Sequence, residues 1–159
     1  MKEVDVKIMR EGAKLPVRGS SNAAGYDLCA ELSNNEFMEV EPGTNKKFVR
    51  IPDGATRKIG TGLAISPPTG TFGAIFARSG LATKQGLRPA NCVGVCDPDY
   101  TGEYVVAIHN DSDCCRKIYQ GDRIAQLIFI PFVEADFTIV DELNETERSS
   151  KGFGSTGLQ

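Results

Sequence analysis

The sequence contains no tryptophan and one histidine, His109, and none of its apolar runs approaches the ~20 residues that a membrane-spanning helix requires. We therefore expect no membrane-embedded segment. With a single histidine, a tetrahedral zinc site built from cysteine and histidine would need awkward geometry, and Ser-His-Asp chemistry has little support. His109 lies in an apolar run, so we expect a strand residue rather than a catalyst.

An excess of basic charge is also missing. The chain has 18 Lys and Arg residues against 21 Asp and Glu, a net charge of −3, and no block of basic residues. We therefore expect no direct nucleic-acid binding, which needs a basic surface. Residues 1–5 include acids and lack the apolar region of a signal peptide, which predicts a cytoplasmic or nuclear protein. The five cysteines form an odd count, so we expect reduced thiols.

The 159 residues predict one domain of the all-β class. Glycine and proline are scattered along the chain and predict many turns. The only helical segment that we expect is a short one at 80–85, ended by Gly86. Pro131 is expected to close the last long strand or to place it at an edge. This pattern favours a β-sandwich or jelly roll. The runs with strand character are 4–8, 47–51, 62–66, 73–77, 104–109, 124–130 and 137–140.

The last residues break this pattern. They are too polar for a core and too rich in glycine for a helix, and Phe153 stands between two glycines beside Ser155 and Thr156. Such a composition fits a flexible arm that orders over a ligand, with a ring that can stack and groups that can bind anions. We therefore expect a β-domain at 1–141 and an arm at 142–159.

Four internal segments concentrate chemistry. Segment 24–28 sets Asp27 in a strand beside glycine, and segment 77–82 places Arg78 and Ser79 at the start of a short helix, where free N–H groups favour phosphate. Segment 94–103 carries three acids and a tyrosine in a hairpin-like stretch, and segment 121–126 begins a strand after a turn.

Taken in this order with residues 148–157, these segments resemble the five motifs of the trimeric dUTPases, the deoxyuridine triphosphate nucleotidohydrolases. The resemblance runs almost from end to end. Ala77 stands where the family usually has proline, and Thr101 where it usually has arginine. Ser149 and Lys151 stand in an arm that is usually richer in glycine, which bears on how the arm closes.

The resemblance implies a distorted jelly-roll homotrimer with active sites at the subunit interfaces and an arm that reaches a neighbouring subunit. The implied reaction is attack of water on the α-phosphorus of dUTP, which yields dUMP and pyrophosphate with Mg²⁺ chelated by the triphosphate. Such an enzyme keeps uracil out of DNA and supplies dUMP for thymidylate synthesis.

The resemblance also implies roles for single residues. Asp97 would be the general base for the attacking water. Asp27 and Gln126 would be outer partners of the magnesium waters or of the phosphates, and Asp27 is the one metal-site candidate, through water. The implied ligands of the α- and β-phosphates are Arg78, Ser79 and Gly80.

The base and the sugar would be read by one hairpin. Asn91, Gly94 and the backbone from Cys92 to Tyr100 would bind uracil, and the Tyr100 ring would lie under the deoxyribose and exclude a 2′-hydroxyl. Phe153 would stack on the uracil. Arg148, Ser155 and Thr156 would bind the γ-phosphate, and Gly154 is a further substrate-binding residue of the arm.

Two other functions remain open. A dCTP deaminase has a related fold, but it should carry a catalytic glutamate and a differently built base pocket, whereas segment 94–100 matches the hydrolase. A nucleotide-binding regulator without turnover is the second alternative, although all five motifs keep their reactive residues. Release of pyrophosphate or of ammonia from nucleotides would separate these functions.

Overall fold

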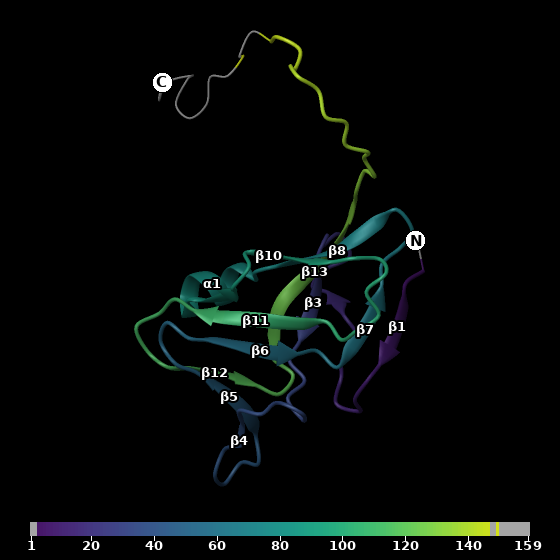
Figure 1. The fold of residues 1–159 in the computed structure, drawn as a ribbon. Coiled ribbons are helices and arrows are strands. Elements are labelled where there is room, and N and C mark those ends of the chain that lie inside the picture. Colours follow the sequence, from purple (N-terminus) through teal and green to yellow (C-terminus); the bar gives the residue numbers. More distant parts are fainter. Residues whose placement is uncertain (1–2, 147–148, 150–159) are drawn as a thin grey trace.

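The structure is a computed structural model that describes residues 3–146 and 149, and the fold is almost entirely β (Figure 1). Within those residues the only helix is α1 (Ser79–Gln85). The strands are β1 (Asp5–Ile8), β2 (Val17–Arg18), β3 (Tyr26–Cys29), β4 (Met38–Val40), β5 (Lys47–Ile51), β6 (Thr56–Gly60), β7 (Leu63–Ser66), β8 (Thr71–Phe76), β9 (Leu87–Pro89), β10 (Val93–Cys96), β11 (Val105–Asn110), β12 (Arg116–Tyr119) and β13 (Arg123–Pro131).

All strand pairs in the described part of the chain are antiparallel, and they form four sheets. The largest sheet has the order β10-β8-β13-β3-β2, and the others are β6-β11-β9, β12-β5-β4 and β1-β7. The core lies between these sheets, because its buried side chains come from strands of all four, including Leu28, Val49, Ile65 and Ile108. Two-sided burial of this kind confirms the predicted jelly roll.

The local patterns follow the sequence. In β11 the side chains of Val106, Ile108 and Asn110 are buried and those between them face outward, which is the alternation of a half-buried strand. His109 lies on the outer side, where its Nδ1 is 2.9 Å from Thr56 Oγ1, as expected for a strand residue. The predicted short helix is confirmed as α1.

Gly86 ends helix α1 with φ 68°, a left-handed conformation that glycine adopts without a steric penalty. Its N–H bonds to carbonyls of the last helical turn. The expected end of the helix is therefore confirmed.

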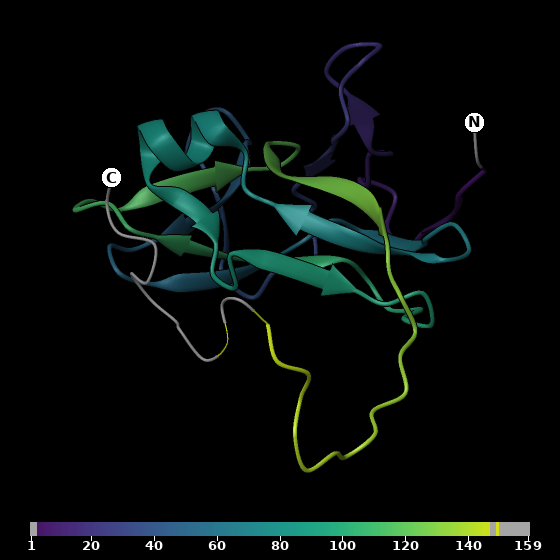
Figure 2. The same ribbon diagram turned by 90° about the horizontal axis from the view of Figure 1, so that it is seen from above.

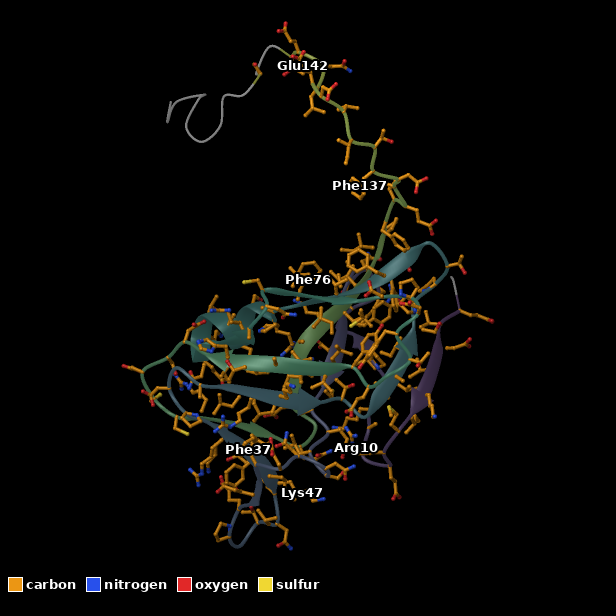
Figure 3. The ribbon with its side chains drawn as sticks, in the orientation of Figure 1. Arg10, Phe37, Lys47, Phe76, Phe137 and Glu142 are labelled. Atoms are coloured by element: carbon orange, nitrogen blue, oxygen red, sulfur yellow. The ribbon has the colours of Figure 1, made fainter. Side chains whose placement is uncertain are left out.

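The strand predicted at 137–140 is wrong. After β13 ends at Pro131 the chain runs away from the body, and in Figure 3 the labelled Phe137 and Glu142 project into open space. Phe137 is 98% and Ile139 100% exposed. A strand needs a partner for its N–H and C=O groups, and none of the residues that the structure describes pairs with this segment. The last strand of the described residues therefore ends at Pro131.

All five cysteines are free thiols, and Cys29 is buried. Burial raises the pKa of the Cys29 thiol, so this group stays protonated and inert at neutral pH. Over residues 3–146 and 149, no helix has the length and apolarity needed to cross a membrane.

Asn110 generates a prediction about stability. Its buried amide donates to the carbonyls of Ile51 (2.9 Å) and Cys114 (2.8 Å) and accepts from the N–H and hydroxyl of Ser112. Asn110→Ala should lower the free energy of unfolding by about 3 kcal/mol, because it leaves several buried polar groups without partners. Urea unfolding at equal protein concentration measures the change. The exposed Asn34→Ala is the control, and equal midpoints for the two variants would contradict this account.

Candidate active site

The segments that carry Asp27, Arg78 and Gln126 lie side by side on the largest sheet. Strand β13 pairs with β3 on one side and with β8 on the other, so that Gln126 lies opposite both Asp27 and Phe76. Helix α1 follows the end of β8 (Figure 2). Arg78 is the residue that precedes the helix, so it lies where β8 ends. Three segments that are distant in sequence therefore meet because β13 is the central strand.

Asp27 is the centre of this cluster. Its carboxylate is buried and accepts from Arg78 Nε at 2.8 Å through Oδ1 and from Arg123 Nη1 at 3.1 Å through Oδ2. Arg78 Nη1 also donates to the carbonyl of Arg123 at 3.2 Å. Two guanidinium charges against one carboxylate leave one net positive charge. The cluster is therefore suited to bind an anion.

Gln126 is held by the same group of strands. Its Nε2 donates to the carbonyl of Ala77 at 2.9 Å. A Cβ at position 25 would lie 2.8 Å from Gln126 Oε1, so Gly25 leaves the space that the Gln126 side chain occupies. Gly25 of the first motif therefore makes room for Gln126 of the fourth motif.

The first residues of α1 are open to ligand. Ser79 and Gly80 are exposed, and a Cβ at Gly80 would meet no atom within 4 Å. The first turn contains no acidic residue, and no side chain caps the helix. The expected phosphate residues Arg78, Ser79 and Gly80 therefore share one exposed surface beside the arginine cluster.

The hairpin that was expected to read base and sugar lies on β10 and the turn after it. Tyr100 N donates to the carbonyl of Asp97 at 3.1 Å and closes a turn with Pro98 at its second position, where proline is favoured. The side chains of Asp97 and Tyr100 are exposed. A Cβ at Gly94 would lie 3.5 Å from Asn91 Nδ2, so the Asn91 amide lies close to the strand there.

Within one chain, Asp97 lies far from Arg78. In the antiparallel register β10 places Val93 opposite Phe76 and Cys96 opposite Gly73, so Asp97 continues away from Arg78. The segment from Gly73 to Arg78 alone spans about 17 Å at ~3.3 Å per residue. The expected base and the expected phosphate ligands are therefore well separated within the chain.

The arm residues Arg148, Phe153, Gly154, Ser155 and Thr156 lie outside the described residues. Sequence reasoning assigned no role to Arg123, although its motif was recognised. Arg123 directly precedes the strand expected at 124–130, and a basic residue at this place in a recognised motif could have indicated its role. Sequence reasoning also missed the ion pair of Arg10 with Glu103. Arg10 lies in no motif, and Glu103 ends the segment 94–103 but was given no role.

The donor set fits a metal ion that is carried by the nucleotide. Among the described residues, no three His, Cys, Asp or Glu side chains group around a common point. Both oxygens of Asp27 are engaged by guanidinium groups. An ion held mainly by phosphate oxygens and water, as Mg²⁺ commonly is, needs no such group.

The jelly roll and the cluster of Asp27, Arg78 and Arg123 define an all-β protein whose largest sheet carries two arginines around one carboxylate. The dUTPase family model matches residues 11–157. The chain is 44% identical over 163 residues to a deoxyuridine 5′-triphosphate nucleotidohydrolase of Desulfitobacterium hafniense, covering 99% of each chain. A Kluyveromyces lactis protein of the same name is 40% identical over 153 residues, which cover 96% of this chain and 92% of the relative.

A solved structure has the same fold. The dUTPase of Staphylococcus bacteriophage 80alpha with dUPNHPP matches with a TM-score of 0.83 and 26% identity, covering 99% of this chain and 100% of the other. The chain belongs to the dUTPase family.

The geometry around Asp27 leads to a prediction. Asp27→Asn removes the charge that orients Arg78 and Arg123 but leaves both cations. We expect kcat on dUTP to fall by about 10- to 100-fold, the scale of a lost charge-assisted hydrogen bond. Binding of inorganic pyrophosphate, measured by calorimetry, should not weaken. Glu39→Gln disrupts the exposed pair with Arg50 and is the matched control. An unchanged kcat for Asp27→Asn would show that the arginines need no such anchor.

Proposed function

We propose that this chain hydrolyses dUTP to dUMP and pyrophosphate through attack of water on the α-phosphorus. The observation that carries the proposal is the cluster of Asp27, Arg78 and Arg123 on adjacent strands, in a chain that belongs to the dUTPase family. The relatives' printed names support the same reaction.

The arginine cluster would stabilise the charge of the leaving group. Negative charge grows on the pyrophosphate as its bond to the α-phosphorus breaks, and prepositioned guanidinium groups favour that change. Arg78, the Ser79 hydroxyl and the Gly80 amide are the proposed ligands of the α- and β-phosphates. Mg²⁺ bound to the triphosphate would neutralise part of its charge, with Asp27 and Gln126 near its water shell.

The proposed base, Asp97, would take a proton from the attacking water. This role requires a carboxylate within hydrogen-bond reach of that water. Because the chain keeps Asp97 away from Arg78, the base at each site would come from a second copy of the chain. A homotrimer with sites between subunits satisfies this requirement.

The hairpin would select the nucleotide. Backbone donors and acceptors beside Asn91 and Gly94 can separate uracil from cytosine, because the two bases reverse their hydrogen-bonding roles at positions 3 and 4. The Tyr100 ring would lie under the deoxyribose and leave no space for a 2′-hydroxyl.

The exposed segment after Pro131 supports assembly. Its exposed apolar side chains include Phe137 and Ile139. The segment has the composition of a strand, but none of the residues that the structure describes pairs with it. We propose that this segment packs on a neighbouring subunit. The arm beyond it would then close a site there, with Phe153 on the uracil and Arg148, Gly154, Ser155 and Thr156 near the γ-phosphate.

Nucleotide selectivity tests the proposed function. With dUTP, UTP, dTTP and dCTP in Mg²⁺ buffer, dUTP should be hydrolysed far faster than the others, because the hairpin reads uracil and Tyr100 excludes the 2′-hydroxyl. Pyrophosphate and ammonia are both measured. A similar kcat/KM for UTP would contradict the proposed exclusion of the 2′-hydroxyl by Tyr100. Ammonia from dCTP would favour a deaminase, and binding without any product would favour a regulator.

Sharing of sites between subunits is tested by mixing two inactive variants. Asp97→Asn should lower kcat by about 10²- to 10⁴-fold through loss of the base. A chain truncated before Arg148 should keep its fold and its trimeric state, but lose activity with its arm. After joint unfolding and refolding, mixed trimers should regain activity, because some sites combine an intact base with an intact arm. Verified exchange without recovery would contradict an arm that acts on a neighbour.

A further inference from the structure

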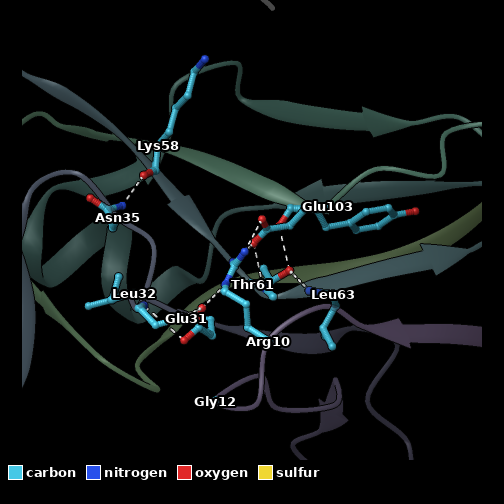
Figure 4. A network of polar contacts seen from close by, with 12 residues as sticks. Arg10, Gly12, Glu31, Leu32, Asn35, Lys58, Thr61, Leu63 and Glu103 are labelled. Atoms are coloured by element: carbon cyan, nitrogen blue, oxygen red, sulfur yellow. Dashed lines mark hydrogen bonds and ion pairs between the residues drawn. The ribbon is translucent and has the colours of Figure 1, made fainter.

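Arg10 forms a charged network that none of the proposed catalytic steps uses (Figure 4). It follows β1, and its side chain lies between Glu31 and Glu103. Nε donates to Glu31 Oε2, Nη1 donates to Glu103 Oε2 at 2.8 Å, and Nη2 donates to Glu103 Oε1. The Glu31 side chain is only 2% exposed and that of Arg10 16%, so these charges are largely removed from water. A charge that is removed from water destabilises the fold unless an opposite charge lies beside it, so each member of this network needs its partner.

Hydrogen bonds within the network shift the pKa values of Arg10 and Glu31 in the direction that favours their charged forms. The hydrogen bonds with Glu103 and Glu31 raise the pKa of Arg10 despite partial burial. Burial acts to raise the pKa of Glu31, but the bonds from Arg10 and Ser33 outweigh it and lower that pKa. A lowered carboxyl pKa stabilises the folded state at neutral pH, and that stabilisation is lost as the pH falls into the acid range.

The surrounding backbone leaves space for these side chains. A Cβ at Gly60 would lie 2.4 Å from Glu103 Oε1 and 2.7 Å from Arg10 Nη2. Glu103 Oε1 also accepts from the N–H of Gly62 at 2.8 Å. Glu103 is therefore held by a side chain after β1 and by the backbone between β6 and β7.

Glu103 also contacts Tyr100. The Tyr100 hydroxyl donates to the main-chain carbonyl of Glu103 at 2.9 Å. A Cβ at Gly102 would lie 2.5 Å from that hydroxyl oxygen, so the ring lies against the backbone there. The ring also stacks on Tyr104, with centroids 6.3 Å apart. Tyr100 N closes the turn that begins at Asp97. Arg10 is thus connected through Glu103 to the turn that carries the expected base and sugar selector.

We propose that Arg10 is a positioning residue for sugar selection. It holds Glu103, and the carbonyl of Glu103 holds the Tyr100 ring where a 2′-hydroxyl has no space. The inference rests on the proposed function and deepens it. Tyr100 is 47% exposed, so few contacts other than these hold its ring in place. Without Arg10, the Glu103 carboxylate loses its counter-charge, and the backbone that anchors the ring can move.

The test compares Arg10→Met with Glu31→Gln in the full chain. The measured quantity is kcat/KM for dUTP divided by kcat/KM for UTP. Arg10→Met should lower this ratio by about 10- to 100-fold, since small displacements at a distance have effects of that size. Most of the change should come from better turnover of UTP and a higher KM for dUTP. Glu31→Gln also disrupts the buried network, but it leaves the pair of Arg10 with Glu103, so its ratio should equal that of the wild type.

Folding is controlled separately. Circular dichroism and solution mass verify each variant, and the double variant Arg10→Met, Glu31→Gln removes the buried carboxylate that Arg10→Met leaves unpaired. The double variant should show the same lowered ratio. A ratio within about twofold of the wild type in a folded Arg10 variant would overturn the role of Arg10. An equal loss in Glu31→Gln, or failure of both Arg10 variants to fold, would assign the network to stability alone and overturn it as well.

The outcome for the wild type separates the two proposals. A selective wild type with an equally selective Arg10→Met refutes only the positioning role. A wild type that does not hydrolyse dUTP, or that hydrolyses UTP equally well, refutes the proposed function and this inference with it.

Discussion

The antiparallel pairing of β10 with β8 is the constraint on which the rest of the site depends. It places Asp97 and Arg78 at opposite ends of a strand pair, so the proposed base and the proposed phosphate ligands lie on different parts of the surface. No side-chain rotation closes a gap of this size. A chain with this register therefore needs a second copy to complete the proposed reaction. The apolar segment after Pro131 has no strand partner among the described residues. Its proposed packing on a neighbouring subunit would meet the same need.

The second feature of the structure is the pairing of buried carboxylates with arginines. Asp27 and Glu31 are both carboxylates removed from water, and each is matched by arginine. The two clusters differ in their net charge. Around Asp27 two guanidinium groups leave a net positive charge, which suits a phosphate chain, whereas Arg10 with two carboxylates leaves a net negative charge, which suits internal support. The same interaction therefore serves ligand binding at one place and backbone positioning at another.

Much of the fold was predictable from local patterns. The alternation in β11, the end of α1 at Gly86 and the closure of β13 at Pro131 follow from side-chain period, left-handed glycine and the missing proline donor. Short strands such as β2 and β9 were not predicted, because strands of two or three residues carry no period that a pattern can show. The strand predicted at 137–140 has the right composition, but strand formation depends on a partner that local sequence does not reveal.

The sequence by itself determined the residue types of the site and their order, and through its motifs it indicated the family. Only the tertiary structure decided which of these residues meet. It joined Asp27 to Arg78 and Arg123 through the central position of β13, and it kept Asp97 apart from them. It also revealed Arg10, which carries no motif because its partner Glu103 is distant in sequence. The physical reason is that strand pairing and register are long-range properties, set by the burial of whole sheets rather than by any one segment.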